Sequence, residues 1–195
     1  MSDAQISRFA VPQLHEMPTD IRERIEGVQE KSGFVPNVFL ALAGRPDEFR
    51  AFFSHHDALM EKSDGLSKAE REMIVVATSS ANACHYCVVA HGAILRIRAK
   101  NPLLADQVAI NYLKADLSKR ERDILGFAML VCEESHKVDD EALENMRNKG
   151  FSNDEIWDIG AIAAFFAMSN RMANLTGMRP NDEFYGMGRS LPGKN

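Results

Sequence analysis

The stretch that decides the fold is Leu66–His91, which reads LSKAEREMIVVATSSANACHYCVVAH. Ser67 precedes Glu70 by three positions, and this S-x-x-E spacing is the capping box that begins many helices. The apolar run Met73–Ala77 follows, and it lacks the strict alternation that marks a half-buried strand. The stretch therefore predicts a largely buried helix and then a second helix that begins near Ala83.

Two further helix starts carry the same capping box, at Ser118 and at Ser152, each with a glutamate three positions later. The seven residues that begin at Leu66 recur from Leu117 with five identities. This recurrence indicates either a duplicated helical unit or two helix starts that converged on the same capping chemistry. Because the remaining apolar runs also lack strand alternation, we predict an all-α chain.

Length and composition favour one globular domain. The chain has 195 residues, of which 45% are apolar and 26% charged, and a domain of this size can bury a core without disulfides or metals. Prolines punctuate its first part, where we expect one helix near Ile21–Lys31. We expect a single domain over 1–195, with an N-terminal arm (1–35), a helix pair that carries two cysteines (66–100), a second helical unit (117–178) and a loop after Pro180.

Charge and hydropathy exclude several partners. The net charge of −5 gives no basic surface for nucleic acid. No apolar stretch approaches the roughly 20 residues that cross a membrane, so no membrane partner is expected. The first residues lack the basic and apolar segments of an export signal, and three cysteines in such a chain indicate a reducing compartment. We therefore expect a cytoplasmic protein.

Two cysteines and a histidine lie close together in the second helix. Asn82 is a good N-cap, and in a helix that begins near Ala83 the side chains of Cys84, Cys87 and His91 share one face. Two thiols at this spacing can form a disulfide, and a helix N-terminus lowers the pKa of a thiol. Cys84 lies nearer that end, so we expect it to be the more exposed and more acidic thiol. His91, one turn beyond Cys87, can accept a proton from it.

Glu72 is the fourth candidate, because it directly precedes the apolar run of the first helix. It is either a solvated acid of the first turn or a partly desolvated one, and desolvation would raise its pKa and suit it to proton transfer. With Cys84, Cys87 and His91 it forms the pattern E-x11-C-x2-C-x3-H.

This pattern, with the capped helix before it, resembles the AhpD-like alkylhydroperoxidase group of the carboxymuconolactone decarboxylase superfamily. Its uncharacterised peroxidase-related branch is similar over further segments: Ile6–Phe9, Lys31–Asn37, Gly150–Ile156 and Phe165–Arg171. The resemblance implies an AhpD-like helical bundle with an internal helical pseudo-repeat. It also implies a homo-oligomer, often a trimer or hexamer.

The activity that the resemblance implies is reduction of hydrogen or organic peroxides by the cysteine pair. Cys87 would attack the peroxide, and Cys84 would resolve the product and meet the external reductant, a thiol or lipoyl-type dithiol. Glu72 and His91 would relay protons, with no bound cofactor or metal. Some members have a histidine directly before the second cysteine. Here Tyr86 takes that place, and the adjacent His85 points elsewhere on a helix and does not inherit the role.

Three alternatives remain open. A general dithiol–disulfide oxidoreductase would use the same residues on another substrate. A non-enzymatic interaction protein would keep the two thiols as buried packing. A metal-binding protein would use both thiolates, His91 and Glu72 as zinc ligands, although this spacing is unusual for zinc.

The other conspicuous residues are predicted to be structural. Cys132 ends an apolar run, so we expect a packing role. His55 and His56 are adjacent and cannot face the same way on a helix, so one should be exposed and the other packed. Trp157 and the pair Phe165–Phe166 are expected in the core or in an interface.

Overall fold

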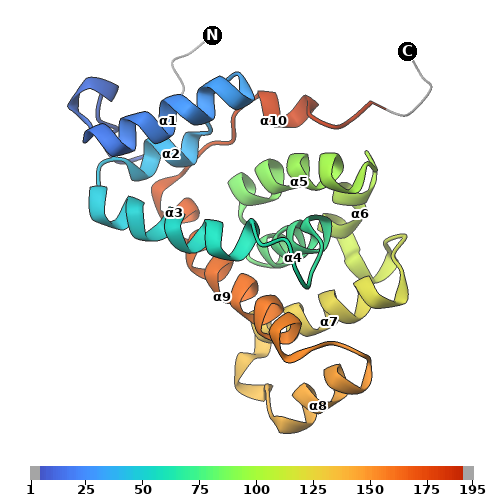
Figure 1. The fold of residues 1–195 in the computed structure, drawn as a ribbon. Coiled ribbons are helices and arrows are strands. Elements are labelled where there is room, and N and C mark those ends of the chain that lie inside the picture. Colours follow the sequence, from blue (N-terminus) through green and yellow to red (C-terminus); the bar gives the residue numbers. More distant parts are fainter. Residues whose placement is uncertain (1–4, 191–195) are drawn as a thin grey trace.

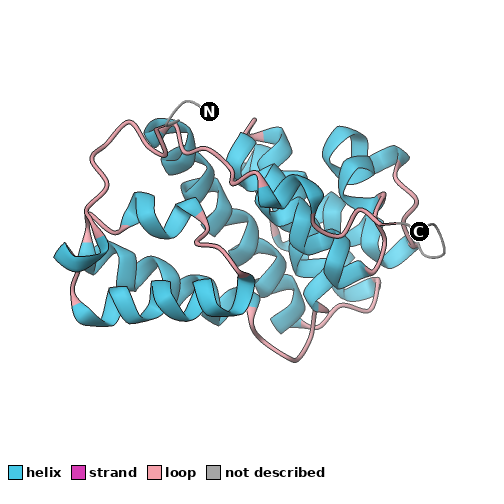
Figure 2. Ribbon diagram, turned by 90° about the horizontal axis from the view of Figure 1, so that it is seen from above, coloured by secondary structure: helices cyan, strands magenta, loops and turns pink. Residues whose placement is uncertain are grey.

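The computed structural model describes residues 5–190, and within this range the chain forms helices and loops but no strand (Figures 1 and 2). The all-α prediction is confirmed. The helices are α1 (Thr19–Ser32), α2 (Asn37–Leu42), α3 (Pro46–Met60), α4 (Lys68–Ala81), α5 (His85–Ala99), α6 (Leu104–Asn111), α7 (Lys119–Glu134), α8 (Asp140–Asn148), α9 (Asn153–Thr176) and α10 (Glu183–Gly186). Three short 3-10 turns cover Leu14–Glu16, Tyr112–Lys114 and Ser135–Lys137.

All three predicted capping boxes form, at the starts of α4, α7 and α9. The acids of two boxes are joined by a side chain from the third helix. Arg120 of α7 binds Glu70 at 2.7 Å and Glu155 at 2.6 Å. The same local sequence signal therefore begins three helices, and Arg120 links their N-terminal ends.

The repeated seven-residue segment also has a repeated local structure. Arg71 donates from Nε to the carbonyl of Leu66 at 3.2 Å, and Arg122 donates in the same way to Leu117 at 3.1 Å. The two arginines then differ in environment, because Arg71 is fully buried and also binds Asp158 at 2.9 Å. The two repeated segments therefore have the same local structure in the turn before the helix and in the first helical turn.

Helix α4 is the centre of the bundle. Its residues 70–79 are all buried, and it packs against α5, α6, α7 and α9 (Figure 1). This burial matches the apolar run that the sequence shows. Because α4 and α5 pack along each other, side chains from the two helices can meet between them.

The first part of the chain lies against α3. The predicted helix near Ile21–Lys31 appears as α1, and its Ile21 and Ile25 pack with Phe49 and Phe53 of α3. Figure 1 shows α1 and α2 on the side of α3 away from α9. Side chains of α1, α3 and α5 line one cavity.

One structural prediction is wrong. The chain after Pro180 is not all loop, because α10 follows and Phe184 is buried there. The buried guanidinium of Arg96 on α5 binds the carbonyls of Phe184 and Met187, each at 2.8 Å, and holds this segment in place. Trp157 is 75% exposed, so of the two places predicted for it, core or interface, the interface stays a prediction, whereas Phe165 and Phe166 are buried as predicted. Across residues 5–190 there is no helix with the length and apolarity needed to cross a membrane.

Candidate active site

The turn between α4 and α5 differs from the prediction. Asn82 ends α4 instead of beginning the next helix, and its side chain donates to the carbonyl of Thr78 and to Asn170, each at 3.0 Å. Ala83 then has a φ of 49°, in the left-handed region that reverses the chain direction. The prediction that Asn82 caps a helix beginning near Ala83 is therefore wrong.

Cys84 takes the N-cap position instead. Helix α5 begins at His85, and Cys84 Sγ accepts a hydrogen bond from the backbone N–H of Cys87 at 3.4 Å. The two thiols thus lie at the positive end of the helix dipole, where a thiolate is stabilised. Cys84 is 0% exposed and Cys87 is 2% exposed. The expectation that Cys84 is the more exposed thiol is wrong, because the turn folds it inward under α9.

The two thiols have opposite pKa shifts. Hydrogen bonds from the Cys87 side chain, the Cys87 backbone and Asn170 together lower the pKa of Cys84 to about 7 in spite of burial, and the bond from the Cys87 side chain contributes most. The same hydrogen bond raises the pKa of Cys87, and burial and the charge of Cys84 add to this rise. As pH rises through neutrality, the first proton therefore leaves Cys84 and the remaining one stays on Cys87.

The titration of the two thiols can be measured by following thiolate absorbance against pH. We expect the first transition of the reduced protein near pH 7, below the ordinary thiol value of about 8.5. In Cys87→Ala, Cys84 loses its main hydrogen-bond donor, so its transition should move to higher pH. Cys87→Ser keeps a donor and should shift it less. An unchanged transition in Cys87→Ala would show that the Cys87 hydrogen bond does not lower the pKa of Cys84.

Burial raises the pKa of Cys132, so this third thiol should titrate at higher pH than Cys84.

Glu72 and His91 form a hydrogen-bonded pair between α4 and α5. Glu72 Oε2 lies 2.8 Å from His91 Nδ1, and the two side chains are only 10% and 12% exposed. A carboxylate at Nδ1 assigns the imidazole proton to that nitrogen and leaves Nε2 as the acceptor. Glu72 is thus a desolvated acid with a specific partner, which is the second of the two environments expected from the sequence.

His91 and Cys87 share the wall of one cavity of about 260 Å³. Cys84 is not among the described residues that line it. Most of its wall is apolar and comes from α1, the loop after it, α2, α3, α5, α9, α10 and the residue that follows α10: Val28, Phe34, Val38, Phe39, Phe52, Phe53, Ala90, Ile94, Phe166, Phe184 and Met187. The rings of Phe34 and Phe184 pack edge to face with centroids 5.1 Å apart. The first and last parts of the chain thus complete the cavity.

Tyr86 and His85, between the two cysteines, face different environments. Tyr86 is buried in the cavity wall, and its hydroxyl accepts a hydrogen bond from the Val38 backbone at 3.2 Å. Burial raises the pKa of Tyr86, so the phenol stays protonated. His85 is exposed, and its Nε2 lies 2.7 Å from the Tyr185 hydroxyl. This agrees with the prediction that His85 points away from the site.

Sequence reasoning missed His56. The prediction that one of the adjacent histidines is exposed and the other packed is confirmed, with His55 exposed and His56 half-buried. His56 nevertheless lines the cavity beside His91 and Cys87. It lies outside the E-x11-C-x2-C-x3-H pattern, and only the packing of α3 against α9 brings it there. Ser169 and Asn170 of α9, whose hydrogen bonds oppose the rise in the pKa of Cys87, were missed for the same reason.

Cys132 lies apart from the cavity wall. Its Sγ is 3.5 Å from Asn82 Nδ2 and 3.9 Å from the Thr78 carbonyl, and the residue is half-buried. These contacts agree with the packing role expected for it. Within residues 5–190, no three histidine, cysteine or acidic side chains are arranged to hold a metal ion.

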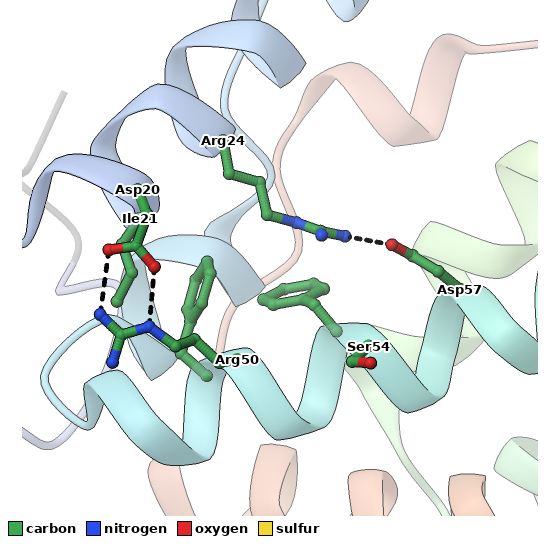
Figure 3. A pocket seen from close by; sticks show the side chains of 8 residues that line it. Asp20, Ile21, Arg24, Arg50, Ser54 and Asp57 are labelled. Atoms are coloured by element: carbon green, nitrogen blue, oxygen red, sulfur yellow. Dashed lines mark hydrogen bonds and ion pairs between the residues drawn. The ribbon is translucent and has the colours of Figure 1, made fainter.

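A second hollow lies on the outer side of α3, between it and α1 (Figure 3). Its charged side chains bind one another, with Arg50 on Asp20 at 2.7 and 2.9 Å and Arg24 on Asp57 at 2.7 Å. Because these charges neutralise each other, the hollow offers no reactive group. Its importance is that Arg24 and Asp57 also line the cavity that holds Cys87.

The helical fold and the buried CxxC pair beside a histidine–glutamate pair define a protein of the AhpD-like class. Residues 46–102 match the model of the Carboxymuconolactone decarboxylase family. A crystal structure from Ralstonia eutropha JMP134, described as an alkylhydroperoxidase AhpD core and uncharacterized peroxidase-related protein, is 65% identical. The structural match covers 95% of this chain and 98% of that one, with a TM-score of 0.94. The chain therefore belongs to the carboxymuconolactone decarboxylase family, among its AhpD-like, peroxidase-related proteins.

Other solved structures support the fold. An uncharacterized peroxidase-related protein from Silicibacter sp. TM1040 is 38% identical to this chain. The match covers 97% of this chain and 99% of that one, with a TM-score of 0.91. The debrominase Bmp8 has the same fold at 20% identity, covering 93% of this chain and 95% of that chain, with a TM-score of 0.72. No curated protein sequence matches the chain.

Proposed function

We propose that the protein is an antioxidant thiol-dependent peroxidase that reduces hydrogen or organic peroxides through the Cys84–Cys87 pair. The observation that carries this proposal is the position of Cys87 in the wall of an apolar cavity beside His91, whose Nδ1 is held by Glu72. A thiol, a base within the same cavity and a carboxylate that orients the base are the parts of an activated nucleophile. The peroxidase-related names of the similar proteins agree with it.

The oxidation step proceeds on Cys87. His91 Nε2 accepts the Cys87 proton, and the thiolate attacks the terminal oxygen of the peroxide. The O–O bond breaks, the alkoxide or hydroxide leaves, and it takes the proton from His91 to give an alcohol or water. Cys87 becomes a sulfenic acid. The Cys84 thiolate then attacks that sulfur, and hydroxide leaves with a proton as water, so that a Cys84–Cys87 disulfide forms.

Burial changes the expected route of re-reduction. Cys84 was expected to meet the external reductant, but it is 0% exposed and Cys87 faces the cavity. We therefore assign Cys87 Sγ as the atom that the external thiol attacks. Cys84 then leaves as the thiolate of lower pKa, and thiols of lower pKa leave faster in such exchanges. A second thiol of the reductant releases Cys87 and completes its own disulfide.

The reducing equivalents would come from an external thiol or lipoyl-type dithiol, with no bound cofactor. We also propose that the chain works in the cytoplasm as a homo-oligomer, a trimer or hexamer. Large apolar side chains on its surface support assembly, since Ile110 is 86% exposed and Trp157 is 75% exposed.

Peroxide consumption with a panel of reductants tests the function. Dihydrolipoamide or dithiothreitol should sustain turnover of hydrogen peroxide or cumene hydroperoxide, and a monothiol should support it less well. A protein that reduces disulfide substrates but no peroxide would instead be a general dithiol–disulfide oxidoreductase.

The disulfide itself can be mapped after a short peroxide pulse. Non-reducing peptide mapping should find a Cys84–Cys87 bridge and leave Cys132 as a free thiol, because Cys132 lies outside the cavity wall. A dominant bridge to Cys132 would contradict the assignment.

A further inference from the structure

We propose that His56 of α3 is a second catalytic histidine, whose Nε2 accepts the O–H of a bound hydroperoxide and aims its terminal oxygen at Cys87. This role rests on the proposed peroxidase function. It adds a residue that lies outside the E-x11-C-x2-C-x3-H pattern and comes from a different part of the chain.

Two histidine–carboxylate pairs face the same cavity. His91 Nδ1 is 2.8 Å from Glu72, and His56 Nδ1 is 3.1 Å from Asp57 Oδ1. The two imidazole centroids are 6.4 Å apart, and the Phe166 ring contacts both. Cys87 lines the cavity with them. The cavity of about 260 Å³ that these three residues line has room for a hydroperoxide.

The orientation of His56 is fixed from behind. Arg24 of α1 donates to Asp57 Oδ2 at 2.7 Å (Figure 3), and Asp57 Oδ1 faces His56 Nδ1. The guanidinium of Arg24 also lies over the Phe53 ring at 4.9 Å. The Arg24–Asp57–His56 chain therefore keeps a proton on Nδ1 and a lone pair on Nε2. In the described part of the chain, Nε2 has no hydrogen-bond partner.

The two histidines have different roles. Burial and then the neighbouring charge of His91 lower the pKa of His56, which keeps it neutral. A neutral Nε2 accepts a hydrogen bond from the peroxide O–H while His91 carries the proton taken from Cys87. The O–H hydrogen stays on the terminal oxygen and becomes part of the sulfenic acid. The proton on His91 goes to the departing alkoxide, so the step balances without a further reactant.

The first experiment compares kcat/KM for cumene hydroperoxide in variants of adjacent positions. His56→Phe should lower kcat/KM about 10- to 100-fold, the loss of one hydrogen bond to a reacting group. His56→Gln keeps an acceptor oxygen and should recover much of this loss. His55→Gln is the matched control, because His55 is exposed and lies outside the described cavity wall, and it should retain wild-type activity.

A second variant covers the case in which His56→Phe does not fold. Asp57→Asn is nearly isosteric, and because Arg24 needs an acceptor and takes the amide oxygen, the NH2 group faces His56 Nδ1 and moves the imidazole proton to Nε2. The acceptor is then lost while the ring remains, so kcat/KM should fall in the same direction. Full activity in a folded Asp57→Asn or His56→Phe would overturn the role of His56.

A second measurement separates an effect of His56 on the bound peroxide from an effect on the reactivity of the Cys87 thiol. The rate of iodoacetamide alkylation at Cys87 should be unchanged in His56→Phe, because His91 acts on the thiol and His56 acts on the peroxide. An equal fall in alkylation and in peroxide reduction would overturn the proposal and leave His56 as part of the scaffold. If the wild-type protein reduces no peroxide, the proposed function fails and this role fails with it.

Discussion

Replacing Glu72 with glutamine is expected to lower peroxide turnover by roughly 10²–10⁴-fold, the usual contribution of a general acid–base group. Glutamine can still accept the His91 Nδ1–H bond, but it lacks the charge that stabilises the imidazolium formed when His91 takes the Cys87 proton. Because the size and hydrogen bond are kept, the melting temperature should stay close to that of the wild type. Steady-state turnover and a thermal melt of the same preparation check both parts.

The repeated segment supplies a matched control. Asp123 occupies the position of Glu72 in the second copy, but it binds Lys119 at 3.0 Å and Lys149 at 2.9 Å away from the cavity. Asp123→Asn should therefore leave turnover unchanged. Near-normal turnover in a stable Glu72→Gln would leave Glu72 as an acid of the first helical turn with no part in proton transfer.

The fold was largely predictable because its signals are local. A serine and a glutamate three positions apart satisfy each other's backbone groups wherever they occur, so the starts of α4, α7 and α9 follow from the sequence. The pairing of Glu72 with His91 was also predictable, because the two residues lie on consecutive helices, α4 and α5, that pack along each other.

The features that sequence missed depend on distant segments. Cys84 is buried because the turn at Ala83 has a positive φ and α9 covers it, and neither appears in the residue pattern. His56 reaches the cavity only through the packing of α3, and Phe184 closes the cavity from the far end of the chain. Such contacts join residues that no spacing rule relates.

Trapping of sulfenic acid with dimedone decides which thiol attacks the peroxide, and here two physical effects oppose each other. The pKa of Cys84 is lowered to about 7, which favours Cys84 as the thiolate. Access favours Cys87, because Cys87 lines the cavity with His91 while Cys84 is 0% exposed. A proton moves between hydrogen-bonded sulfurs or to an adjacent imidazole without a change in structure, but a peroxide cannot reach a sulfur that the protein encloses.

We therefore expect Cys84→Ser to form a dimedone adduct on Cys87 and Cys87→Ser to form none. Cys87→Ser should lose dithiol-dependent turnover because it lacks the attacking thiol, and Cys84→Ser should form no intramolecular disulfide. Cys132→Ser is the control and should behave like the wild type. An adduct confined to Cys84 would reverse the roles. It would mean that the cavity opens to Cys84 in solution and that the lower pKa outweighs the position of His91.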